Sequence, residues 1–204
     1  MQNIKNVIFD LGGVLLKVDY KASEAAFAQM GLNNYQEYFK QDYSSALFEQ
    51  LESGAITDLQ FYEGFRATFK TDASDTTIKG AWNAMIGDFV PENLHFLQSV
   101  AQKYKVYLFS NTNQIHYNCF HAKYAKQFGH NDFDKHFIKA YYSQICGWRK
   151  PNPQAYSNLL EAEGLIASET LFIDDTLKNI TGAQEAGLQT VHLTNISLLN
   201  NINL

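Results

Sequence analysis

The chain has 204 residues, of which 16 are basic and 21 are acidic, so its formal net charge is −5. A hydrophobic content of 46% with 14% aromatic residues excludes a disordered chain, which would be poor in both. The modest net acidity gives no electrostatic reason to expect binding to nucleic acid or to a membrane surface. The length permits one domain, or one domain that carries a smaller insertion.

Cysteine usage and the N-terminal residues indicate the cellular compartment. Cys119 and Cys146 are too few for a disulfide scaffold, and neither lies in a Cys-x-x-Cys motif. The first residues lack the basic-then-apolar pattern of a signal peptide. No window approaches the ~18 consecutive apolar residues that a membrane helix needs. We therefore expect a cytoplasmic protein in a reducing environment.

Short and continuous apolar runs alternate with helical patterns along most of the chain. Continuous runs of this kind are typical of strands buried on both faces of a parallel sheet. The predicted strands are Val7–Phe9, Val106–Phe109, Leu171–Ile173 and Gln189–Leu193. The predicted helices are Glu92–Tyr104, Gln114–Phe128, Pro153–Gly164 and Leu177–Gly187. This alternation predicts an α/β fold with a doubly wound parallel sheet.

The pattern changes between residues 18 and 90, where no strand-like run occurs. Phe61, Phe65 and Phe69 recur every four residues, a helical spacing that indicates core packing. The sequence thus predicts an α/β core made of residues 1–17 and 91–204, interrupted by an all-helical insertion over residues 18–90.

Polar side chains follow three of the predicted strands. Asp10 follows the first, Ser110-Asn111-Thr112 follows the second, and Asp174-Asp175 follows the third. Ligands of open α/β sheets bind at this carboxyl edge, although a single polar residue there can equally cap the next helix. Two adjacent acids repel each other unless a cation or a basic side chain neutralises them. Carboxylate oxygens suit Mg²⁺, which binds one or two carboxylates together with water and phosphate.

A basic element precedes the helix that is predicted to begin at Pro153. Lys150 lies between Arg149 and Pro151, and the prolines on its C-terminal side restrict the local backbone. A cation fixed near the acids could balance their charge and bind a phosphate group. Each of these signals is weak alone, and their order along the chain makes them specific.

These motifs resemble those of the haloacid dehalogenase superfamily of hydrolases, over nearly the whole chain. The four motifs of that family match Asp10, Ser110, Lys150 and the Asp174-Asp175 pair, in the same order. The insertion over residues 18–90 resembles the family's helical cap, which lies over a Rossmann-like core. The stretches around Asp10, Ser110 and Lys150 are most similar to small sugar-phosphate phosphatases of the glucose-1-phosphatase kind.

The resemblance implies a role for each motif residue. Asp10 would be the nucleophile and would form an aspartyl phosphate that water then hydrolyses. Mg²⁺ would be held by Asp10, the carbonyl of Gly12 and Asp175, with Asp174 either a ligand or an acid behind the ligands. The catalytic residues would be Asp10, Ser110 and Lys150. The substrate would contact Gly12, Ser110, Asn111 and Lys150.

The sequence departs from the family pattern at position 12. Phosphatases of the family usually carry a second aspartate there as general acid and base, and this chain has Gly12. General acid–base help is worth typically 10²–10⁴-fold, so its loss would slow turnover without removing the nucleophile. The expected function is hydrolysis of a small phosphorylated metabolite. The alternative is a weak or inactive domain that binds a phosphorylated ligand or a protein partner, and dehalogenation of a 2-haloacid is a less favoured reading.

Several further points stay open at this level. Asn113 and His116 follow the second motif and could face the substrate. Glu49, Glu52 and Ile56 flank a turn at Gly54 that is either a plain connection or a loop facing the site. The other histidines are too irregularly spaced for a metal cluster. The partner expected is a small phosphorylated molecule, and both a monomer and a homodimer are compatible with the sequence.

Overall fold

A computed structural model describes residues 3–40 and 43–204 of the chain. The strands are β1 Asn6–Phe9, β2 Leu16–Val18, β3 Phe39–Lys40, β4 Tyr43–Ser44, β5 Ile86–Phe89, β6 Lys105–Ser110, β7 Lys139–Tyr142, β8 Thr170–Asp174 and β9 Gln189–His192. The α-helices are α1 Tyr20–Gln29, α2 Ala46–Glu52, α3 Asp58–Phe69, α4 Asp75–Asn83, α5 Pro91–Ala101, α6 Gln114–Phe128, α7 Ser143–Cys146, α8 Pro153–Glu163 and α9 Leu177–Glu185. Short 3₁₀ helices are η1 Tyr35–Glu37, η2 Phe133–His136, η3 Ala167–Glu169 and η4 Ile196–Asn201.

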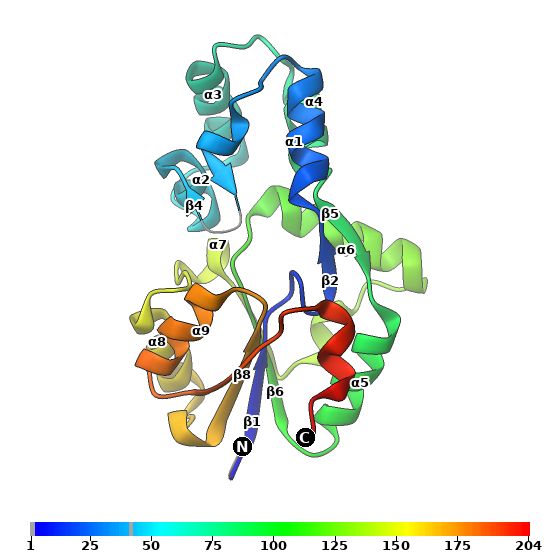
Figure 1. Ribbon diagram of the computed structural model, residues 1–204, viewed down its shortest axis with the longest axis vertical. Helices are drawn as coiled ribbons and strands as arrows, with labels where there is room; N and C mark the ends of the chain where they lie inside the picture. The colour runs from blue at the N-terminus through cyan, green and yellow to red at the C-terminus, as the bar shows by residue number, and fades with distance from the viewer. Residues whose placement is uncertain (1–2, 41–42) are drawn as a thin grey trace.

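A five-stranded parallel sheet with the order β7-β6-β1-β8-β9 forms the centre of the core. The predicted doubly wound α/β fold is confirmed, with α8 and α9 on one side of the sheet and α5 on the other (Figure 1). The edge strand β7 was not predicted. Its Lys139 is exposed and its Ala140 half-buried, so it lacks the continuous apolar run of an interior strand.

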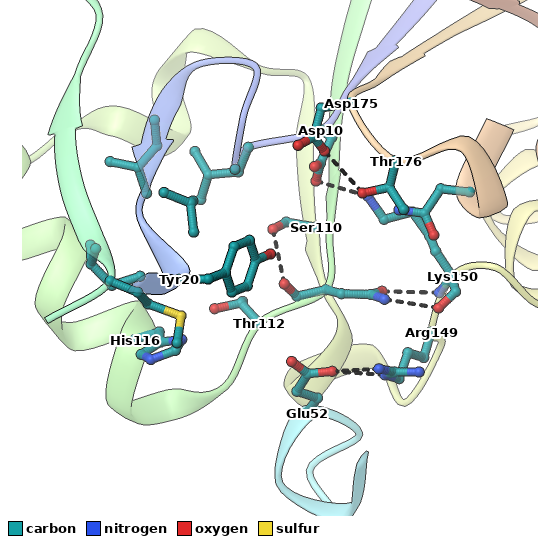
Figure 2. A pocket seen from close by; sticks show the side chains of 18 of the residues that line it. Asp10, Tyr20, Glu52, Ser110, Thr112, His116, Arg149, Lys150, Asp175 and Thr176 are labelled. Carbon is teal, nitrogen blue, oxygen red and sulfur yellow. Dashed lines mark hydrogen bonds and ion pairs between the residues drawn. The ribbon is translucent and has the colours of Figure 1, made fainter. Parts of the chain in front are cut away.

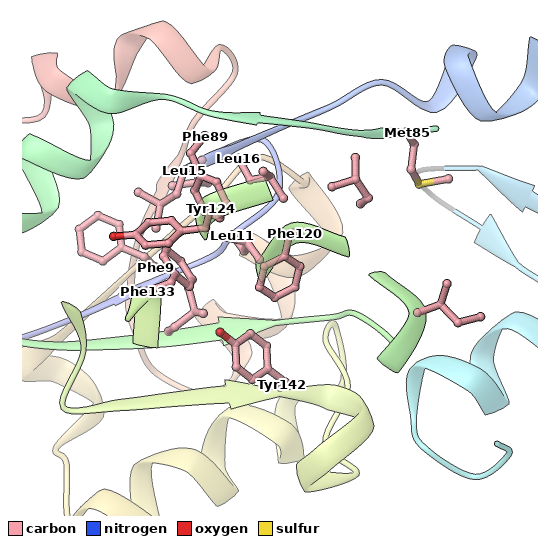
Figure 3. Packing of buried hydrophobic residues seen from close by; sticks show 14 of the residues in the cluster. Phe9, Leu11, Leu15, Leu16, Met85, Phe89, Phe120, Tyr124, Phe133 and Tyr142 are labelled. Carbon is pink, nitrogen blue, oxygen red and sulfur yellow. The ribbon is translucent and has the colours of Figure 1, made fainter. Parts of the chain in front are cut away.

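Alternating side chains of the strands build two apolar layers. Ile8 and Phe172 point to the layer under α8 and α9, where they pack with Tyr156. Phe9 points the other way, into a larger cluster that also contains Leu15, Phe89, Tyr124 and Phe133 (Figure 3). Both layers keep water from β1, and β1 therefore holds Asp10 at a fixed point of the sheet edge.

Helices α1 to α4 form a cap above the carboxyl ends of the strands (Figure 1). The predicted aromatic stripe is packed as expected, because Phe61 and Phe65 are fully buried and Phe69 packs partly buried against them. Trp82 lies in the same cluster, 5.1 Å between ring centroids from Phe48. Cap stability thus comes mainly from aromatic packing.

The prediction that residues 18–90 contain no strand is wrong. β3 pairs with β4 inside the cap, and β5 pairs antiparallel with β2 where the chain leaves and re-enters the core. β3 and β4 have two residues each, and β5 contains Gly87 and Asp88, so none of them shows an apolar run. The division of the chain at residues 17/18 and 90/91 stays a prediction.

One contact between the cap and the core is made by α2 and the turn that follows it. A Cβ atom at Gly54 would lie 2.2 Å from the carbonyl oxygen of Gln144, so α7 approaches this turn too closely for any side chain. Gly54 also has φ +71°, a conformation that glycine adopts at little cost. Within the described ranges, no helix has both the length and the apolar composition to cross a membrane.

Another close approach fixes the loop that carries Lys150. A Cβ atom at Gly182, in α9, would lie 1.9 Å from the carbonyl oxygen of Pro151, whereas one at Gly80, in α4, would meet open space. We expect Gly182→Ala to lower the free energy of unfolding by about 1–3 kcal/mol through overpacking. Gly80→Ala should raise it by about 0.5–1 kcal/mol, because alanine loses less backbone entropy in a helix.

Urea unfolding of both variants measures these free energies. If Gly182→Ala were as stable as Gly80→Ala, α9 would not hold the Pro151 backbone as tightly as the structure indicates.

Candidate active site

The carboxyl ends of three neighbouring strands bring the predicted polar residues together. Asp10 directly follows β1, Ser110 ends β6 and Asp174 ends β8. Because β1 pairs with both β6 and β8, the three residues meet at one edge of the sheet. Asp10 and Ser110 lie at the floor of a cavity of about 560 Å³ that the cap covers, whereas Asp174 is fully buried and does not line it. The residues that line this cavity come from both the cap and the core.

Lys150 links two of these acids. Its Nζ lies 2.8 Å from Oδ1 of Asp10 and 2.7 Å from Oδ2 of Asp174, and the side chain is 1% exposed. The rings of Phe109 and Phe172 lie 5.6 and 5.2 Å from the same nitrogen. Burial lowers the pKa of Lys150, but Asp10 and Asp174 outweigh it and raise the pKa above its ordinary value. The ammonium therefore stays charged and neutralises one carboxylate.

Asn111 positions the backbone of Lys150. Its Nδ2 donates to the Lys150 carbonyl at 2.8 Å, and its Oδ1 accepts from the Lys150 amide at 2.9 Å. The two bonds hold the segment after β6 against the Lys150 loop. Asn113 caps α6 instead, so Ser110 is not used as a helix cap. The Ser110 side chain lines the cavity, and its hydroxyl lies 3.5 Å from the Asn111 carbonyl.

Asp174 and Asp175 have different surroundings, although they are adjacent. Asp174 is fully buried and accepts from Lys150, from the Thr176 amide at 2.7 Å and from Asn179 Nδ2 at 3.0 and 3.1 Å. Asp175 lines the cavity, and its Oδ1 accepts from the Thr176 hydroxyl at 3.1 Å. Asp174 is thus committed to protein donors, which makes Asp175 the better direct ligand for a cation.

The three carboxylates fit a divalent cation. Asp10, Asp174 and Asp175 each offer an oxygen within 4.8 Å of the others. Three carboxylates with one ammonium leave two negative charges. Burial, with repulsion from Asp174 and Asp175, raises the pKa of Asp10 to about 7, although Lys150 opposes the rise. Burial and Asp174 raise the pKa of Asp175 to about 6. Mg²⁺ would relieve this excess charge.

Gly12 and Gly13 form the opposite side of this cluster. A Cβ atom at Gly13, whose φ is +71°, would lie 2.2 Å from Oδ2 of Asp175, so the loop after β1 lies against that carboxylate. Gly12 lines the cavity. Its predicted role as a carbonyl ligand for the metal stays a prediction.

The upper part of the cavity combines one ion pair with an apolar wall. Arg149 Nη2 lies 2.8 Å from Oε2 of Glu52 and Nη1 lies 3.6 Å from Oε1 of Glu49, which joins the Lys150 loop to α2 of the cap. The wall is made by Leu16, Val18, Tyr20, Phe39, Met85, Ile86 and Phe120. Of the residues left open by the sequence, Glu49, Glu52 and His116 line the cavity, whereas Ile56 and Asn113 do not.

Sequence reasoning missed most of this wall and the Arg149–Glu52 pair. Tyr20, Phe39 and Met85 belong to the predicted insertion, and their apolar character alone did not separate them from core residues. For Arg149, its place beside Lys150 was the available signal, because both side chains leave the same short loop.

Comparison with known proteins adds three findings. A model of the haloacid dehalogenase-like hydrolase family matches residues 4–187. A D-ribitol-5-phosphate phosphatase of Bacteroides thetaiotaomicron is 28% identical over 189 residues, which cover 92% of this chain and 90% of its own. A solved haloacid dehalogenase family enzyme of the same organism, in complex with magnesium and inorganic phosphate, is 35% identical with a TM-score of 0.79, and the match covers 93% of each chain.

The carboxylate cluster predicts a stabilisation by Mg²⁺. An ion that binds only the folded chain at ten times its Kd adds about 1.4 kcal/mol, which raises the melting temperature of a chain this size by a few degrees. The rise should shrink as the pH falls below about 7, because protons bind Asp10 and Asp175 in competition with the metal.

Thermal melting of the wild type and of Asp175→Ala, with and without Mg²⁺ at pH 8 and pH 5.5, measures this effect. Asp88→Ala removes an exposed acid outside the cavity and serves as the control. A Mg²⁺-dependent rise that persists in Asp175→Ala would contradict the assignment of Asp175 as a ligand.

Proposed function

Because the chain belongs to the haloacid dehalogenase-like hydrolase family, we propose that it hydrolyses a small phosphorylated metabolite through an aspartyl phosphate on Asp10. The observation that carries this proposal is the position of Asp10. Its carboxylate lies at the cavity floor, 2.8 Å from a buried ammonium and next to two further acids. A carboxylate held in this way is fixed in orientation, as a nucleophile for phosphoryl transfer must be.

Magnesium is the cofactor that the family relatives and the donor set support. Asp10 and Asp175 would hold it, with the Gly12 carbonyl as a further oxygen ligand. When bound, the ion would offset the charge of the phosphate oxygens and of the carboxylates. The ion pair with Asp174 holds the Lys150 ammonium beside Asp10.

The protein residues of the site have separate roles in the transfer of the phosphoryl group. The Asp10 oxygen attacks phosphorus, the bond to the leaving oxygen breaks, and its electron pair stays on that oxygen, which takes a proton from water. Ser110 and the Asn111 amide bind the transferring phosphoryl oxygens, and Lys150 neutralises phosphate and nucleophile together. A water molecule then attacks phosphorus and releases phosphate, and Asp10 is regenerated with the loss of one proton to solvent.

We propose a sugar or polyol phosphate as the substrate. The relative named D-ribitol-5-phosphate phosphatase supports a polyol. The cap side of the cavity supplies the Glu49 and Glu52 carboxylates and the Arg149 guanidinium, which can accept from and donate to hydroxyl groups. The buried floor would bind the phosphate, and the cap would then contact the rest of the molecule.

Gly12 is the observation that favours the alternative, a weak or inactive domain that binds a phosphorylated ligand or a protein partner. A glycine cannot transfer a proton, so the residue that the family usually employs at this position is missing. A 2-haloacid dehalogenase remains less favoured, because that reaction gives the three clustered acids no purpose.

The nucleophile assignment is tested by Asp10→Asn. We expect phosphate release from para-nitrophenyl phosphate to fall at least about 10³-fold, because the amide is a poor nucleophile and covalent catalysis must supply several kcal/mol of the barrier reduction. The fold should persist, and the metal-free variant should melt at or above the wild-type temperature, because one of three repelling acids is gone.

Phosphate release is measured with saturating Mg²⁺, and Asp88→Asn, an exposed aspartate of β5, is the matched control. Turnover by Asp10→Asn above about a tenth of the wild-type rate would be incompatible with Asp10 as the nucleophile. A wild type without activity towards any phosphate ester would instead favour the binding domain.

A further inference from the structure

The leaving-group side of the cavity has no acid at position 12. If the proposed function holds, a hydrogen-bond donor elsewhere in the cavity would stabilise the departing oxygen in its place. A Cβ atom at Gly12 would lie 3.1 Å from Cγ2 of Val18, so position 12 faces strand β2. The chain continues from Val18 to Tyr20, the first residue of α1, which also lines the cavity.

His116 is the obvious proton donor near the site, and its contacts exclude it. Its Nε2 lies 3.1 Å from the Trp82 carbonyl, and its Nδ1 lies 3.2 Å from Nδ2 of Asn113. The carbonyl requires a proton on Nε2, and Nδ1 then accepts from the amide. Burial lowers the pKa of His116 to about 4, so the ring is neutral and both nitrogens are engaged.

Glu52 also binds another side chain of the protein, that of Arg149. Its Oε2 accepts from Nε of Arg149 at 2.8 Å and forms an ion pair with Nη2 of the same residue at 2.8 Å. Burial raises the pKa of Glu52 and the Arg149 guanidinium opposes the rise, and both of these contacts of Oε2 go to Arg149. The Thr176 hydroxyl likewise donates to Asp175.

Tyr20 has a hydroxyl that is available. Its ring packs against Phe39 with centroids 6.2 Å apart. Figure 2 shows this ring reaching into the cavity, with its hydroxyl towards Ser110. In the part of the chain that the structure describes, no hydrogen bond is found for this hydroxyl. An unpartnered phenol that faces a ligand cavity is a donor for a ligand oxygen.

The surroundings of Tyr20 keep its proton in place. Burial raises the pKa of the phenol well above its ordinary value, and the carboxylates of Asp175, Glu52, Asp10 and Asp174 raise it further. The group is therefore a hydrogen-bond donor across the physiological range. It does not act as a general base.

We propose that Tyr20 is a catalytic residue that donates a hydrogen bond to the leaving-group oxygen of the phosphate ester. As the bond between phosphorus and that oxygen breaks, the oxygen keeps the electron pair and gains negative charge. The phenol retains its own proton throughout, and the released alcohol takes its proton from water. The hydrogen bond strengthens as charge develops, so it lowers the barrier more than it strengthens substrate binding.

This role predicts a dependence on the leaving group. A good leaving group, such as para-nitrophenolate, disperses its charge and gains little from a donor, whereas phenolate gains more. Tyr20→Phe should reduce kcat/KM for phenyl phosphate about tenfold or more, the effect of losing a hydrogen bond to a charged oxygen. For para-nitrophenyl phosphate the loss should stay below about threefold.

Tyr35→Phe is the matched control. The Tyr35 phenol is 3% exposed, has no hydrogen-bond partner among the described residues and stacks on Phe27 with centroids 4.3 Å apart. It belongs to the same aromatic cluster of the cap but does not line the cavity. Its loss should leave the rate ratio of the two esters at the wild-type value.

The experiment measures kcat and KM of the wild type and both variants on the two esters with saturating Mg²⁺, together with their melting temperatures. A loss in Tyr20→Phe that is mainly in kcat, and larger for phenyl phosphate, supports the proposal. Equal losses on both esters, or no loss, would overturn it while leaving the proposed phosphatase function intact. A wild type inactive on both esters and on polyol phosphates would overturn the proposed function, and the role of Tyr20 with it.

Discussion

The buried ammonium of Lys150 is the interaction on which the site depends. It lies between Asp10 and Asp174, which come from the ends of β1 and β8. Removing this one cation would typically cost about 3–5 kcal/mol, because the buried acids would stay behind without compensation. Asp10 and Asp174 therefore depend on Lys150, whereas Lys150 keeps one carboxylate beside it if either acid is replaced. This dependence fixes the loop after β1, the loop before α8 and the start of α9 against one another.

The rest of the core holds this ion pair in position. Asn111 bonds both the amide and the carbonyl of Lys150, and Gly182 lets the α9 backbone approach the carbonyl of Pro151. Asp174 is further oriented by Asn179. The oxygens of Asp174 accept hydrogen bonds from these donors. Of the two adjacent acids, Asp175 is the one that lines the cavity. One buried acid thus orients the lysine, and its neighbour in sequence remains to hold a cation.

The cap covers the cavity and contacts the core at several points, among them the stacking of Trp82 on His116 with centroids 4.5 Å apart. Arg149 joins Glu52 across the two parts, and it leaves the same loop as Lys150. Gly54 lies against α7. Through Arg149, the loop that binds the nucleophile is also connected to the cap residues that would contact the substrate.

Much of the core could be predicted from the sequence because its signals are local. Buried interior strands such as β1 and β8 are continuous apolar runs, and the polar residues directly after them mark the sheet edge. β7 and β5 could not be predicted in this way, because an edge strand and a two-stranded ribbon bury only part of their residues. The family resemblance supplied the expected roles of the motif residues.

The upper wall of the site could not be predicted from the sequence, since it depends on contacts between distant residues. Nothing near Glu52 in the sequence indicates Arg149, and Tyr20 carries no motif of its own. The different surroundings of Asp174 and Asp175 could not be predicted from the sequence either. Adjacent side chains at a strand end point in different directions, and the sequence does not show which of them points to the cavity. Only the folded structure shows that Lys150 and Asn179 both contact Asp174.

The central claim is that Asp10 carries the phosphoryl group, and a direct measurement is mass spectrometry of the enzyme after acid quench during turnover with Mg²⁺ and a phosphate ester. If Asp10 is the nucleophile, an added phosphoryl group should be found on the peptide that contains Asp10, and it should be absent from Asp10→Asn treated in the same way. Steady turnover with the phosphoryl group on another residue would contradict this claim.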